Sequence, residues 1–182
     1  MPNALEMIRE DHHKVQQLFQ EFETTEDRSA KKRIVENAIQ ELKVHAALEE
    51  ELFYPAVRKQ LDEEETIDEA IEEHHVVKLL ISELEDMSLG DKRYDAKFTV
   101  LSESVKHHIE EEESEVLSEI EGSLDAESLG EQMQKRKQEL LRRASAGRSG
   151  RRSRARSQGS RRGAAARTRG RKKSNKGQRQ AR

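Results

Sequence analysis

The chain has 182 residues, a formal net charge of −3, 39% charged and 32% hydrophobic residues, and no cysteine. This composition supplies too little apolar material for a wide sheet sandwich, whereas an amphipathic helix needs only one apolar stripe. The absence of cysteine excludes disulfides, thiolate zinc sites and thiol catalysis, and it fits a reducing cytoplasm. Only 2 prolines and 9 glycines interrupt the chain, so we expect long helices.

The small net charge hides two parts of opposite sign. Residues 142–182 contain 17 lysines and arginines and no acidic residue, whereas residues 1–141 contain the other 17 basic residues and all 37 acidic ones. The charges are therefore +17 for the tail and −20 for the remainder. Because no apolar periodicity continues into the tail, we expect a folded domain over residues 1–141 and a disordered tail over residues 142–182.

The first two predicted helices cover residues 4–24 and 29–59. Asn3 is the expected N-cap of the first, because Glu6 follows three residues later in a pattern that resembles a capping box. Pro55 lies in the last turns of the second helix and should kink or loosen it there. The expected inward apolar residues are Leu5, Ile8, Val15, Phe19 and Phe22 on the first helix, and Val35, Ala38, Leu42, Leu52, Phe53 and Ala56 on the second.

The third predicted helix begins at Thr66 as its cap and ends at Leu89-Gly90. The fourth covers residues 94–121 before Gly122, and a shorter fifth covers residues 125–143. Short connections make consecutive helices antiparallel, so the sequence predicts an all-α, up-down-up-down four-helix bundle with a short fifth helix. Neither a signal peptide nor a transmembrane run is evident, and we expect a cytoplasmic protein with no membrane partner.

All 7 histidines lie in four segments, one on each long predicted helix. These segments are Asp11-His12-His13, His45-Ala-Ala-Leu-Glu49, Glu73-His74-His75 and His107-His108-Ile-Glu-Glu111-Glu112. Residues four apart on a helix share a face, so His-x-x-x-Glu offers two metal ligands on one side. Four helices that each direct ligands inward are typical of a metal site in the core of a bundle.

The apolar stripe of each helix decides which member of a histidine pair faces inward. Continuing the stripes at helical spacing selects His12, His45 with Glu49, His74, and His108 with Glu112. Glu110, Glu111 and Glu113 fall on a solvated face. A single histidine on an apolar face is usually a satisfied core residue. Six inward polar groups without partners, however, would each cost about 2–7 kcal/mol, against a domain stability of about 5–15 kcal/mol.

The inward set of four imidazoles and two carboxylates predicts the metal content. One tetrahedral zinc ion would leave ligands unused, whereas two ions that share Glu49 and Glu112 as bridges would use all six. Imidazole and carboxylate suit iron, manganese or zinc, and such a pair would keep open positions for a small diatomic molecule or a peroxide.

The same segments resemble the hemerythrin-like, or HHE cation-binding, domains over about residues 1–140. The resemblance rests mainly on His45-Ala-Ala-Leu-Glu-Glu-Glu-Leu-Phe-Tyr-Pro55 and His107-His108-Ile-Glu-Glu-Glu-Glu113, with Asp11-His12 and Glu73-His74-His75-Val-Val-Lys78 in support. It implies a four-helix bundle around two non-haem iron ions that binds oxygen or related molecules, or senses or handles iron. The implied ligands are His12, His45, His74 and His108, with Glu49 and Glu112 bridging.

Two departures separate this chain from the oxygen-carrying members of that family. The carriers have a second histidine one turn after the third-helix histidine, where this chain has Lys78. Their fourth-helix carboxylate falls five residues after the histidine, whereas Glu112 falls four after His108. A more open site favours redox chemistry, nitric oxide or peroxide handling, or sensing over reversible oxygen storage.

A ferritin-like layout is the alternative arrangement of a di-iron site. It uses Glu-x-x-His on two helices, a spacing that Glu10 with His13 and Glu72 with His75 also match. That layout would leave His45 and His108 without a role, and the stripe through Glu10 and His13 is otherwise polar.

The basic tail adds further function classes. Arginine and lysine neutralise phosphates, so residues 142–182 predict salt-dependent, sequence-independent contact with nucleic acid and association with the nucleoid. A solubilising extension, or a tail docked on the acidic bundle, is the other reading. Three classes stay open: a di-iron binding or sensing protein, a peroxide-degrading enzyme that uses the same site, and a nucleic-acid-associated protein in which the metal is structural.

Overall fold

The computed structural model describes residues 2–60 and 64–146, and every regular element in these residues is helical. Two π-helical turns, η1 and η2, continue α2 into α3 and α5 into α6. Residues 126–146 are helical as well. The elements are α1 (Ala4–Thr24), α2 (Arg28–Leu48), η1 (Glu49–Phe53), α3 (Tyr54–Val57), α4 (Glu64–Asp86), α5 (Tyr94–Glu111), η2 (Glu112–Val116) and α6 (Leu117–Glu119).

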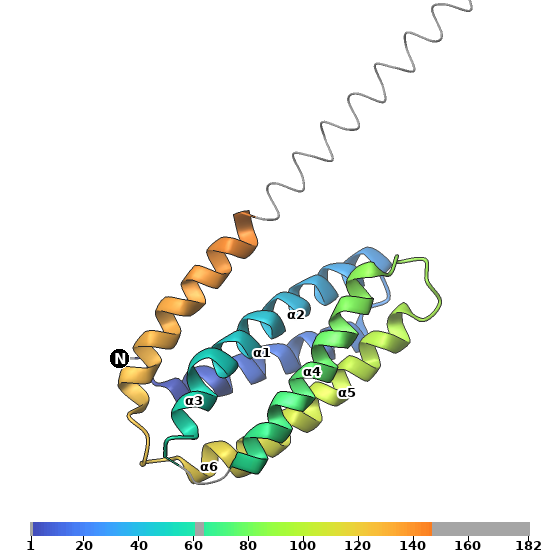
Figure 1. The fold of residues 1–182 in the computed structure, drawn as a ribbon. Coiled ribbons are helices and arrows are strands. Elements are labelled where there is room, and N and C mark those ends of the chain that lie inside the picture. Colours follow the sequence, from blue (N-terminus) through green and yellow to red (C-terminus); the bar gives the residue numbers. More distant parts are fainter. Residues whose placement is uncertain (1, 61–63, 147–182) are drawn as a thin grey trace, which may run out of the picture. The chain divides into compact units, whose positions relative to one another are not determined.

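The four long helices α1, α2, α4 and α5 form the predicted bundle (Figure 1). Helix α1 packs against α2 and α5, and α4 packs against α5 and α2, so that each long helix has two neighbours. The apolar residues predicted to face inward on α1 are all buried. The all-α four-helix bundle predicted from the histidine-bearing helices is therefore confirmed.

Of the two predicted helix caps, Asn3 caps its helix and Thr66 does not. The Asn3 side chain accepts hydrogen bonds from the backbone of Leu5 and Glu6, at 2.9 and 3.3 Å, as an N-cap should. Thr66 lies inside α4, which begins at Glu64, so the predicted cap is wrong. Helix α4 ends at Asp86, before the predicted stop at Leu89-Gly90. Gly122, which follows the fourth predicted helix, is the one described residue with a positive φ, of 85°.

The predicted disturbance near Pro55 takes the form of the π-helical turn η1. Proline has no N–H to give to the carbonyl four residues earlier, and in η1 the Tyr54 N–H bonds to the carbonyl of Glu49, five residues back. The extra residue in this turn rotates everything that follows by about 100°. Consequently the predicted inward residues Leu52 and Ala56 are only half-buried, and the buried ones are Phe53, Tyr54 and Val57.

One cluster of the apolar core gathers buried residues of all four long helices, among them Phe19, Phe22 and Phe98. There the rings of Phe22 and Phe98 lie tilted against one another with their centroids 4.4 Å apart, and Phe19 lies edge-on to Phe98 at 5.7 Å. Residues 1–140 form one compact unit, into which the fifth helix buries Leu129 and Met133.

The fifth helix continues through residue 146, three residues past its predicted end. The remainder of the predicted tail, residues 147–182, lies outside the described residues, and the division at residues 141 and 142 stays a prediction. None of the described helices combines the length and apolar character that a bilayer span requires.

Candidate metal centre

Six polar side chains from four helical segments meet in the middle of the bundle. All six predicted residues, His12, His45, Glu49, His74, His108 and Glu112, are buried, each with at most 6% of its surface exposed. Their neighbours in sequence, His13, His75 and His107, are exposed. Helical phase therefore distinguishes the inward from the outward member of each histidine pair.

The first half of the cluster consists of His12 from α1 and His45 from α2. The Nε2 atom of His45 lies 3.0 Å from Oε1 of Glu49, and Nε2 of His12 lies 3.1 Å from Oε2 of Glu112. Nε2 of His12 is also 4.0 Å from Oε1 of Glu49. One atom from each of these four residues can be chosen so that all lie within 4.8 Å of one another, which is close enough for one metal ion.

The second half consists of His74 from α4 and His108 from α5. Their Nε2 atoms lie 3.2 Å apart, and Nε2 of His74 is 3.3 Å from Oε2 of Glu49. Nε2 of His108 is 4.0 Å from Oε2 of Glu112. Glu49 thus presents one oxygen to each half of the cluster, and Glu112 lies between His12 and His108. Two histidines thus lie on each side of the two carboxylates, and Glu112 is nearer to His12 than to His108.

The hydrogen bonding of these atoms tests whether a metal fits. Within the described part of the chain, both oxygens of Glu49, both oxygens of Glu112, and Nε2 of His12 and of His45 are buried and make no hydrogen bond of normal geometry. Each buried polar atom without a partner costs about 1–3 kcal/mol. Nitrogen and carboxylate oxygen atoms are the ligands that iron, manganese and zinc accept, so metal ions would satisfy these atoms.

A second layer of carboxylates orients three of the imidazoles from outside. Nδ1 of His12 is 2.8 Å from Glu113, Nδ1 of His74 is 2.9 Å from Glu50, and Nδ1 of His108 is 2.8 Å from Glu73. A carboxylate on Nδ1 keeps the proton there and leaves Nε2 free to bind a metal.

The prediction that Glu113 only faces solvent is wrong. Its side chain is 42% exposed, but its carboxylate contacts Nδ1 of His12. Sequence reasoning assigned no role to Glu50 or Glu73. Each of these carboxylates directly neighbours an inward residue in the chain, and that adjacency is the signal that could have identified them.

The buried carboxylates and imidazoles shift one another's protonation in the absence of metal. Burial lowers the pKa of His12, but Glu112 and Glu49 outweigh it and raise the pKa to about 9. Burial likewise lowers the pKa of His74, and Glu49 and Glu50 raise it above its usual value. Burial raises the pKa of Glu49, but His45 and His74 bring it well below the usual range. Glu49 is therefore an anion.

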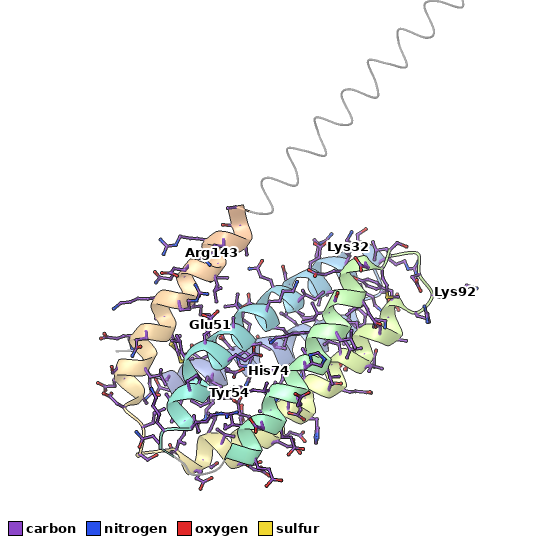
Figure 2. All side chains as sticks on the ribbon, in the orientation of Figure 1. Lys32, Glu51, Tyr54, His74, Lys92 and Arg143 are labelled. Carbon is purple, nitrogen blue, oxygen red and sulfur yellow. The ribbon has the colours of Figure 1, made fainter. Side chains whose placement is uncertain are left out.

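Tyr54 is a residue of the site that sequence reasoning missed. It is buried at the start of α3, with its ring centroid 5.7 Å from that of His74 (Figure 2). Its hydroxyl makes no hydrogen bond of normal geometry, and burial together with Glu49 and Glu112 raises its pKa. An α-helical period continued through η1 does not place Tyr54 on the inward side.

Each of the two π-helical turns begins at a carboxylate of the cluster. Glu49 opens η1 and Glu112 opens η2, and in each turn the N–H five residues later bonds to the carbonyl of that glutamate. Only η1 precedes a proline. In η2 the hydroxyl of Ser118 instead bonds to the carbonyl of Glu113, at 2.9 Å. Such turns often occur at functional sites, where they change the direction of a side chain.

Two arrangements considered from sequence are resolved by burial. Glu10, His13, Glu72 and His75 are all exposed, so the ferritin-like layout does not form. Lys78 also lies outside the cluster. It is half-exposed, and its Nζ contacts both oxygens of Glu50 at 2.5 and 2.6 Å.

Comparison with known proteins gives the same family as the residues. Residues 3–120 match the hemerythrin HHE cation binding domain family. A DNA nickase from Nostoc sp. is 30% identical over 125 residues, which cover 69% of this chain and 35% of the nickase. An uncharacterised hemerythrin-like protein from Schizosaccharomyces pombe is 29% identical over 129 residues, which cover 70% of this chain and 64% of that protein. The chain thus spans less than two thirds of either relative.

The fold also has a counterpart among solved structures. The crystal structure of a hemerythrin HHE cation binding domain-containing protein from Mycobacterium kansasii superposes with a TM-score of 0.64 at 22% identity, covering 77% of this chain and 88% of that one. At this identity the likeness concerns the fold alone. The match over residues 3–120, together with the His/Glu clusters in the core, shows that the chain belongs to the hemerythrin HHE cation-binding domain family and is a metal-binding helical bundle.

Proposed function

We propose that the chain is a non-haem di-iron protein that binds or senses oxygen, nitric oxide or a peroxide. His12 and His45 would hold one iron, His74 and His108 the other, and Glu49 and Glu112 would bridge them. The observation that carries this proposal is the position of the two glutamates. Both are buried between the histidine pairs, and none of their four oxygens makes a normal hydrogen bond.

Iron is preferred over a structural zinc ion because the shared ligands leave coordination positions open, and it is preferred over manganese because the resemblance to the hemerythrin-like domains implies iron. A structural zinc site is tetrahedral and closed, whereas six shared ligands would leave two six-coordinate ions with free positions. Bound iron would supply one-electron redox chemistry. The chain itself would orient three imidazoles through Glu50, Glu73 and Glu113, exclude bulk water by burial, and place the Tyr54 hydroxyl beside Glu112.

Sensing or turnover is favoured over reversible oxygen storage. The carriers of this family use one more histidine at the position of Lys78, and Lys78 pairs with Glu50 outside the cluster. The half-site of His74 and His108 would therefore have one protein ligand fewer than in a carrier. Iron handling, or peroxide breakdown as an enzymatic activity, is compatible with the same open position, and steady oxygen evolution from peroxide would identify the enzyme.

Metal analysis of the purified full chain tests this proposal most directly. We expect two irons per chain and an absorption spectrum in air that changes on anaerobic reduction and returns on reoxidation. His74→Ala should lose at least one iron, whereas His75→Ala, its exposed neighbour, should keep both. A single zinc per chain, or equal metal loss in the two variants, would exclude the di-iron centre. A long-lived reversible oxygen adduct would show that the chain can store oxygen, and would contradict the preference for sensing or turnover.

We propose, as a second function, that the basic tail holds this centre near nucleic acid. Residues 142–182 carry +17, and the first relative is named a DNA nickase, of which this chain matches about a third. Arginine-rich segments bind phosphates without sequence preference. Truncation before Arg142 should abolish DNA retention at moderate salt, and retention unchanged by truncation would end the proposal. Incubation of the loaded chain with supercoiled plasmid would show whether it also nicks DNA.

A further inference from the structure

Helix α5 carries a second His-x-x-x-Glu pair, one residue before the buried one. His107 and Glu111 precede His108 and Glu112, and Nε2 of His107 lies 3.3 Å from Oε1 of Glu111. Successive helical residues point about 100° apart, so the two pairs face different sides of α5. His108 and Glu112 are buried, whereas His107 is 63% exposed and Glu111 is 41% exposed.

A carboxylate from the neighbouring helix α4 completes this outer group. Oε1 of Glu73 lies 3.8 Å from Nε2 of His107, and one donor atom from each of Glu73, His107 and Glu111 lies within 4.8 Å of the others. The group thus combines an imidazole and two carboxylates from two packed helices. Three donors of this kind on one side of an ion leave its other positions to water, as in many exposed sites for divalent ions.

Glu73 belongs to both the outer group and the buried centre. While Oε1 faces His107, Oε2 is 2.8 Å from Nδ1 of His108, whose Nε2 points into the centre. One carboxylate therefore joins the surface group to a predicted ligand of the second half-site.

We propose that Glu73, His107 and Glu111 form a surface site for a divalent first-row transition metal ion, and that this site captures Fe²⁺ before it reaches the half-site of His74 and His108. The proposal that the outer group binds an ion stands by itself. The proposal that the outer group takes part in iron uptake rests on the proposed di-iron function. In the contrasting arrangement, His107 only contacts Glu73 and Glu111, and the group binds no metal.

Binding of Mn²⁺ to the iron-loaded full chain tests the site itself. Free aqueous Mn²⁺ gives an electron paramagnetic resonance signal that is lost on binding, so bound ions can be counted. We expect one additional Mn²⁺ per chain, with an affinity that falls at least tenfold in His107→Ala and in Glu111→Gln. His75→Ala is the matched control, because His75 is also an exposed histidine but lies on α4, outside the group. This variant should bind Mn²⁺ as the unaltered chain does. No additional ion, or the same loss in His75→Ala as in His107→Ala, would overturn the proposal.

The uptake role needs a separate measurement. Fe²⁺ added anaerobically to the metal-free chain should load at least threefold more slowly in His107→Ala, with the same final iron content. Equal loading rates in His107→Ala and the unaltered chain would overturn the uptake role. Mn²⁺ binding to His74→Ala separates the two proposals, because that variant damages the buried centre and leaves the outer group intact. If it keeps the surface ion while the unaltered chain fails to hold two irons, the di-iron function falls and the surface site stands.

Discussion

Lys78 holds Glu50 by both carboxylate oxygens, at 2.5 and 2.6 Å, and the same Glu50 bonds to Nδ1 of His74 at 2.9 Å. The residue that replaces a carrier's histidine thus acts one layer further out, on the carboxylate that orients His74. Loss of such an outer partner usually weakens metal binding about 10–100-fold.

Glu50→Gln should therefore weaken metal retention about tenfold or more, and Lys78→Ala should weaken it less, because Glu50 can still accept from His74. The measurement is the rate of metal loss to a chelator. Lys43→Ala is the control, since Lys43 forms a similar exposed pair with Glu85 on the same helix as His74. Metal loss in Glu50→Gln at the rate of the control would show that Glu50 does not orient the ligand.

Tyr54→Phe should separate a structural from a functional role of the buried hydroxyl. The hydroxyl makes no normal hydrogen bond, so its removal should leave the stability of the metal-free chain unchanged or raise it by up to about 1 kcal/mol. The loaded chain should nevertheless show a changed absorption spectrum or an altered affinity for nitric oxide, because the group lies beside Glu112. Denaturant unfolding and ligand titration give the two readouts. Lower stability with an unchanged spectrum would contradict this expectation.

Lys137 on the fifth helix pairs with Asp11, the residue before His12, at 2.5 Å. Asp11 is buried, so Lys137→Ala leaves a buried carboxylate without its partner and should cost about 3 kcal/mol of unfolding free energy. The variant Asp11→Asn/Lys137→Ala should recover part of this loss, because no charge is then left buried. Denaturant titrations of both variants measure the difference. If the double variant proves less stable than Lys137→Ala, the cost does not come from an uncompensated charge.

The stability of the metal-free chain should fall between pH 6.5 and about 9. The folded pKa of His12 is raised from 6.5 to about 9, so its contribution is fully present below 6.5 and is lost as the pH rises through 9. The raised pKa of His74 acts in the same direction. The His12 contribution is at most about 3 kcal/mol. Denaturant unfolding of the chelated chain at pH 6.5, 8 and 9.5 measures it, and His12→Gln should flatten the curve. A stability that rises over this range would contradict the assignment.

Several features followed from the sequence because they depend on local periodicity. The apolar stripes on the long helices placed His12, His45, His74 and His108 on the inward side and their sequence neighbours outside. Helical phase also brought Glu49 and Glu112 inward, because each lies four residues after a histidine. These conclusions needed only the 3.6-residue repeat and the cost of burying unsatisfied polar groups.

The tertiary structure decided what depends on departures from that repeat and on contacts between helices. The π-helical turn η1 rotated Tyr54 inward, and no α-helical stripe predicts such a rotation. The bonds of Glu50 to His74 and of Glu113 to His12 join residues on different helices, 24 and 101 positions apart in the chain. Sequence thus determined which histidines and which two glutamates of the centre enter the core, whereas packing determined which further carboxylates orient the histidines. Periodicity is a property of one helix, and the second layer of carboxylates is a property of pairs of helices.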